Sequence, residues 1–119
     1  MLISIMDIES LRQLCRSLAA VTEDIKWSTD LCFCVGEKMF CVTGLQPDAG
    51  ISFKVTEEEF YELTSRDGII PAPYMARNMW VYVTNKASLT KQEWEHYIRQ
   101  SYDLVGSKLS KKLRKELGI

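Results

Sequence analysis

Apolar residues recur at three- and four-residue intervals near the start of the chain, which is the spacing of a helix with one buried face. Asp7 can cap this helix, which we expect to end near Ala19. Its apolar side is formed by Ile8, Leu11, Leu14, Cys15 and Leu18. A shorter helix is expected to begin after Thr56, which forms a capping box with Glu59, and to stop near Gly68.

The longest helical pattern starts at Thr90, which forms a second capping box with Glu93. Leu89 and Trp94 have the spacing of a hydrophobic staple across this helix start. One broad side of the helix consists of Trp94, Tyr97, Ile98, Ser101, Tyr102, Leu104, Val105 and Leu109. We expect this helix to pack across one face of a sheet.

Three runs in the first half of the chain have strand composition, at residues 31–35, 38–44 and 51–55. The first two are separated by Gly36-Glu37 alone, which is typical of a two-residue hairpin turn. A turn-forming segment, residues 46–50, precedes the third run. The three runs therefore predict an antiparallel meander.

Two other stretches show no clear repeat of apolar residues, either helical or strand-like. Residues 22–30 are polar, and we expect an irregular loop with Trp27 anchored beneath it. Residues 68–83 contain a Pro-Ala-Pro run, which restricts the backbone to extended geometry. We expect this second stretch to cross the molecule without a helix and to enter a fourth strand, which runs from Trp80 to Thr84.

Length and composition fit a single α+β domain over residues 1–119, with an antiparallel sheet and its hairpins packed against helices. The formal net charge of -1 gives no overall attraction for nucleic acid, so such a function would need a local patch. No apolar run approaches the ~20 residues of a membrane span. The apolar opening lacks a basic region and is interrupted by Asp7, so we expect no signal peptide; Met6 is an alternative start. A cytoplasmic monomer is expected.

The four cysteines allow two interpretations. Cys32 and Cys34 fall on one face of a strand, and a metal site would combine them with Cys41 and with Cys15 or His96. Zinc sites usually place such pairs on a turn with two to four intervening residues, which this chain does not do. We therefore expect buried thiols and no metal or other cofactor.

The only histidine, His96, is expected to face solvent, and no phosphate loop, nucleophile elbow or metalloprotease helix occurs. We therefore expect that the protein is not an enzyme.

Ser110 can cap a last helix over residues 111–117 within a basic segment. The basic residues of this segment are Lys108, Lys111, Lys112, Arg114 and Lys115, against Glu116 alone. These residues could contact phosphates, or they could only form a solvated helix face. Arg77 and Asn78, just before Trp80, are a further candidate for contact with a ligand.

Four stretches resemble the MmcQ/YjbR family of small bacterial proteins, and they follow one another in the order found in that family. They are DIESLRQLCRSL, GEKMFCVTGL, GIIPAPYMARNMWVYV and QSYDLVGSKLSKKLRKEL. The resemblance implies an α+β fold of the CyaY-like (frataxin-like) arrangement. Its β-hairpins are described as a "double wing", and on that basis members are regarded as candidate binders of double-stranded DNA.

The resemblance also assigns positions to this DNA-binding role. They are Lys38 in the first hairpin, Arg77 and Trp80 in the central span, and Lys108, Lys111 and Lys112 near the end. Many relatives carry a histidine where this chain has Met75, so any role of that histidine is not shared. The alternative function is an adaptor that binds a protein or small ligand through Tyr74, Trp80 and Tyr82. An exposed Trp80 would favour the adaptor, and a buried Trp80 would belong to the core.

Overall fold

A six-stranded antiparallel sheet, in the order β1-β2-β3-β4-β6-β5, forms the centre of the computed structural model, which describes residues 6–119. The strands are β1 (Val21–Lys26), β2 (Asp30–Val35), β3 (Lys38–Gly44), β4 (Ile51–Lys54), β5 (Ile69–Pro71) and β6 (Trp80–Val83). The helices are α1 (Ile8–Arg16), α2 (Glu57–Thr64), α3 (Lys91–Gly106) and α4 (Lys111–Leu117), with short 3-10 turns η1 (Ala76–Asn78) and η2 (Lys86–Ser88). The expectation about a signal peptide concerns a segment that includes residues 1–5, which lie outside the described residues.

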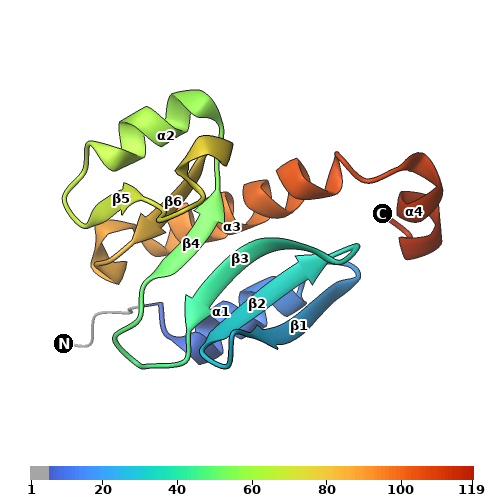
Figure 1. The fold of residues 1–119 in the computed structure, drawn as a ribbon, viewed down its shortest axis with the longest axis horizontal. Helices are drawn as coiled ribbons and strands as arrows, with labels where there is room; N and C mark the ends of the chain where they lie inside the picture. Colours follow the sequence, from blue (N-terminus) through green and yellow to red (C-terminus); the bar gives the residue numbers. More distant parts are fainter. Residues whose placement is uncertain (1–5) are drawn as a thin grey trace.

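The helices α1 and α3 cover one face of the sheet, and α4 lies apart beyond the C-terminal end of α3 (Figure 1). The main core fills the space between the sheet and these two helices, and its largest fully buried side chains are Phe33, Phe40, Phe53 and Trp94. The α+β class predicted from the sequence is therefore confirmed. Within residues 6–119, no helix is long and apolar enough to cross a membrane.

The helix starts are where the caps predicted them. The carboxylate of Asp7 accepts the backbone N–H of Ser10, and both capping boxes, at Thr56 and Thr90, form in both directions. Ser110 caps α4 through the N–H of Leu113. Because each cap satisfies backbone donors that no helix residue can reach, these starts are determined locally. The end of α1 differs, since this helix stops at Arg16, short of Ala19.

The turn between β2 and β3 has left-handed backbone at both central residues, with φ of 58° at Gly36 and 68° at Glu37. This is the conformation that matches the twist of paired strands. A side chain on Gly36 would place its Cβ 2.7 Å from the side chain of Leu109, which lies between α3 and α4. Glycine is thus required both for the turn and for its close contact with the C-terminal region.

The prediction of an irregular loop at residues 22–30 is wrong, because Val21–Lys26 form the edge strand β1. All six residues of β1 are exposed or only half-buried, so the strand lacks the apolar alternation that indicates a sheet. Trp27 is not anchored beneath a loop. It occupies the β1–β2 turn with φ of 56° and is 68% exposed.

The prediction that residues 68–83 cross the molecule as one extended segment is also wrong, because the chain folds back on itself there. Ile69–Pro71 form β5, which pairs with β6, and η1 makes the reversal between them. Proline is tolerated in β5 because this strand lies at the edge of the sheet, where one side of the backbone needs no partner. The predicted strand at Trp80 is confirmed as β6 and ends at Val83, one residue earlier than expected.

Glu23 ties β1 to α1 and gives a pH-dependent contribution to stability. Burial alone would raise its pKa, but hydrogen bonds and charges from Arg12 and Arg16 lower the pKa overall. A lowered pKa means that the stabilisation is complete above the unfolded value of 4.5 and is lost as the pH falls through the folded value.

We expect Glu23→Gln to reduce the free energy of unfolding at pH 7 by about 1 kcal/mol, because the two arginines lose their charged acceptor. The difference in unfolding free energy between variant and wild type should become smaller as the pH falls below the unfolded pKa. Urea unfolding at several pH values measures this difference. A difference that does not change with pH would contradict the role assigned to the Glu23 carboxylate.

Candidate functional site

The sequence-predicted basic residues of the C-terminal segment are exposed and gather at one end of the molecule, which we call the basic end. It combines the basic residues on α4 and just before it with the β2–β3 turn, which approaches Leu109 and Leu113 at the same end. Its exposed cations are Lys38, Lys108, Lys111, Lys112, Arg114 and Lys115. On α4, Leu113 and Leu117 are half-buried against the core, so the lysines of this helix point toward solvent.

The β2–β3 turn brings Lys38 to this end. Gly36 lies in contact with the side chains of Leu109 and Leu113, and Lys38 follows two residues later, exposed at the start of β3. Arg114 is also exposed and lines a small crevice with Asp103 and Ile119. The structure thus joins a hairpin and a helix that are about 70 residues apart in the chain.

Lys54 belongs to the same end and was missed by the sequence analysis. It is the last residue of β4, and its ammonium group donates a hydrogen bond to the backbone carbonyl of Asn78 beside Arg77. Burial lowers the pKa of Lys54, and the positive charge of Lys108 lowers it further. Lys54 therefore links the η1 turn to the basic end. A lysine at the end of an apolar strand gave no sequence signal for this role.

Among the described residues, the opposite face of the sheet carries no α-helix (Figure 1). It holds a second candidate site, which we call the sheet groove. The groove has a volume of about 670 Å³ and is lined by Trp27, Asp30, Met39, Tyr74, Met75 and Tyr82, among others. Trp80, expected as the anchor of this region, is only 7% exposed and packs with Cys32, Val42 and Ala72. By the criterion set from the sequence, Trp80 belongs to the core.

The cysteines are divided between the two faces of the sheet. Cys32 and Cys34 lie in the small cluster on the open face, whereas Cys15 and Cys41 lie in the main core. Burial raises the pKa of Cys32 to about 11, and burial with a hydrogen bond to Cys15 raises that of Cys41. The four thiols are buried as predicted, and no group of three or more metal ligands exists within residues 6–119.

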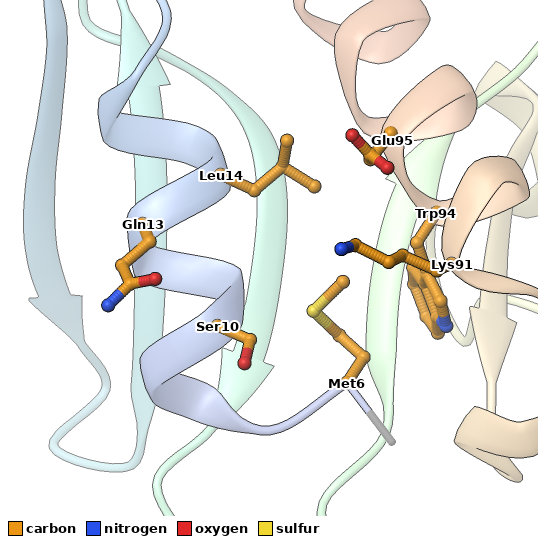
Figure 2. A pocket seen from close by; sticks show the side chains of 7 residues that line it. All are labelled: Met6, Ser10, Gln13, Leu14, Lys91, Trp94 and Glu95. Carbon is orange, nitrogen blue, oxygen red and sulfur yellow. The ribbon is translucent and has the colours of Figure 1, made fainter. Parts of the chain in front are cut away.

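A third depression, of about 350 Å³, separates α1 from the start of α3 (Figure 2). Met6, Ser10, Gln13 and Leu14 form one side, and Lys91, Trp94 and Glu95 form the other. Its charged groups are one exposed lysine and one exposed glutamate, so it has no dominant charge. His96 points elsewhere and is exposed, with Glu59 as its nearest acidic partner at 3.8 Å.

Together, the fold and surface define a small α+β domain with helices on one sheet face, an open groove on the other and a basic end. The YjbR family model matches residues 16–104, most of the chain, and the protein belongs to this family. The crystal structure of the Deinococcus radiodurans protein DR2400, with the family-model domain DUF419, superimposes with a TM-score of 0.87. The two chains are 29% identical, and the match covers 97% of this chain and 90% of the other. No curated protein matches.

The family match ends at residue 104, before all five basic residues of the C-terminal segment. The match to the DR2400 structure, in contrast, covers 97% of this chain. Neither match assigns a role to the basic end.

Proposed function

We propose that the protein binds double-stranded DNA, without catalysis, through phosphate contacts at the basic end. The observation that carries this proposal is the convergence of Lys38, Lys54, Lys108 and the exposed lysines of α4, which come from three different parts of the chain. In a chain of net charge -1, such a concentration must be balanced by acidic surface elsewhere. The molecule is thus polarised, and an anionic partner would approach it from one side.

Lys54 supports an anionic partner in particular. Its partial burial opposes its protonation most, and the neighbouring positive charge of Lys108 opposes it further. A phosphate placed between the two ammonium groups would relieve this repulsion and would make the protonated form of Lys54 more favourable. Lys54 is therefore included among the proposed phosphate contacts.

The contacts available are of the kind that positions a protein on DNA and reads no sequence. Lysines act as point charges on phosphates, whereas base recognition relies mainly on the two-pronged geometry of Arg, Asn or Gln. Arg77 and Asn78 are the exposed side chains of that type near Lys54. Binding is therefore proposed to be independent of sequence and strongly dependent on salt.

The double variant Lys111→Glu/Lys112→Glu is expected to lose most of its affinity for duplex DNA, because two phosphate contacts become repulsive. The slope of log K against log salt should also fall in magnitude by about 1 for each lysine removed. Fluorescence anisotropy with a labelled duplex at two or more salt concentrations measures both quantities.

Lys86→Glu/Lys91→Glu is the matched control. It changes the net charge equally, but η2 and the start of α3 lie at the other end of α3 from the basic end. An equal loss of affinity in this control would show that net charge alone matters. Absence of binding by the wild type at low salt would remove the proposed function altogether.

A further inference from the structure

The sheet groove has two aromatic side chains at its rim whose positions are not explained by packing. Trp27 projects from the β1–β2 turn and is 68% exposed, and Tyr74 projects from the segment before η1 and is fully exposed. Both have left-handed backbone, with φ of 56° and 66°. At Trp27 this conformation belongs to the β1–β2 hairpin turn, where Ser28 also has φ of 61°. Neither ring is buried by it.

The floor of the groove, in contrast, is rigid. The hydroxyl of Tyr82 accepts the backbone N–H of Gly50 at 3.0 Å, and the hydroxyl of Thr43 donates to the carbonyl of Gly50 at 3.0 Å. A Cβ on Gly50 would lie 2.5 Å from the ring of Tyr82, so this ring rests directly on the backbone. The shape of the groove is therefore set before any ligand enters.

Asp30 is the only charged side chain among the described residues that line the groove. Within residues 6–119 it makes no ion pair, and its side chain accepts only a long hydrogen bond of 3.4 Å from Thr29. Its cross-strand neighbour is Lys26, whose side chain does not line the groove. One carboxylate among aromatic rings favours a cation, because ring faces attract positive charge as well.

We propose that the sheet groove binds a small organic cation, an amine or quaternary ammonium with an apolar body. The rings of Trp27 and Tyr74 would flank the ligand, Tyr82 would form its floor, and Asp30 would pair with its charge. A volume of about 670 Å³ is within the range of small-molecule sites. This site is separate from the basic end and holds whether or not DNA binds there.

The test compares 2-phenylethylamine, 2-phenylethanol and phenylacetate, which share a body and differ in charge. Because the chain has three tryptophans, each indole N–H gives its own NMR signal, and Trp27→Phe identifies that of Trp27. We expect the amine to shift this signal with a dissociation constant on the order of 1 mM. The alcohol should bind about tenfold more weakly and the carboxylate not measurably.

Asp30→Asn keeps the shape of the side chain and should bring the affinity for the amine close to that for the alcohol. Tyr74→Ala should weaken all binding, and its full exposure makes misfolding no concern. Tyr61→Ala, which removes an exposed tyrosine from α2 outside the groove, is the control.

Three outcomes would overturn the proposal. They are an unmoved Trp27 signal, equal binding of amine and alcohol, and an amine affinity unchanged by Asp30→Asn. A peptide with trimethylated lysine is titrated alongside. If it binds while the free amine does not, the groove serves a protein partner and the small-ligand assignment fails.

Discussion

Trp94→Ala is expected to lower the free energy of unfolding by about 3–5 kcal/mol, which is the usual cost of removing a large buried aromatic side chain. Trp94 is only 2% exposed, and its ring meets that of Phe53 edge-on with 5.9 Å between centroids. Its indole N–H donates to the carbonyl of Lys86 at 3.1 Å, so it also holds η2 to the start of α3. The variant leaves a cavity and an unpaired carbonyl together.

Urea unfolding measures this loss as a lower midpoint with an unchanged m-value. Trp94→Phe is the matched variant, because it keeps an apolar ring but removes the hydrogen bond and part of the volume. We expect it to lose less than half as much stability. A loss below about 1 kcal/mol for Trp94→Ala would mean that the first turn of α3 can repack without its staple.

The helices were predictable because their starts depend on residues close in sequence. Each cap, from Asp7 to Ser110, is a side chain bonded to a backbone N–H three residues later. The β2–β3 hairpin is predictable for the same reason, since its turn needs only Gly36 and the residue after it. Local chemistry of this kind is visible in a single sequence.

The two edge strands could not be predicted in the same way, because their pairing is with other segments. β1 buries little of its own surface, and its position depends on the register with β2 and on the ion pairs of Glu23 with α1. β5 contains a proline and has only three residues, so its own composition argues against a strand. Both are held in place by partners rather than by a pattern.

The candidate sites were predicted unequally. The basic residues of α4 were identified because they are adjacent in the chain, whereas Lys54 is recognised only from its approach to Asn78 and Lys108. The sheet groove depends on the left-handed turns that carry Trp27 and Tyr74 to its rim. Tyr74 was identified as an anchor, but Trp27 was assigned to a buried position and Asp30 was not considered.

Ser101 is the second residue whose replacement should have a large effect, because it completes the pairing of β3 with β4. The hydrogen-bonded pairing of β3 with β4 runs from Thr43 and Ile51 to Cys41 and Phe53. In the same register, the next pair along the strands would be Phe40 and Lys54. Instead, the Ser101 hydroxyl accepts the N–H of Lys54 at 2.9 Å and donates to the carbonyl of Phe40 at 2.6 Å. A side chain from α3 is thus inserted between two strands.

We expect Ser101→Ala to cost about 2–4 kcal/mol, because it leaves a half-buried donor and a buried acceptor without partners. Ser107→Ala on the same helix is the control, since that serine is exposed and bonds only to the carbonyl of Leu104. Its effect should stay within about 0.5 kcal/mol. Urea unfolding of both variants measures the difference.

Amide hydrogen exchange at Lys54 shows how the strands respond to this substitution. If the strands stay apart, the Lys54 amide loses its acceptor and exchanges faster, together with the expected loss of stability. If Phe40 and Lys54 close into a direct hydrogen bond, protection remains and the loss falls below about 1 kcal/mol, which would contradict the prediction. The same result bears on the basic end, because the backbone that Ser101 fixes carries the ammonium group of Lys54. A variant with faster exchange at Lys54 should therefore also bind duplex DNA less tightly.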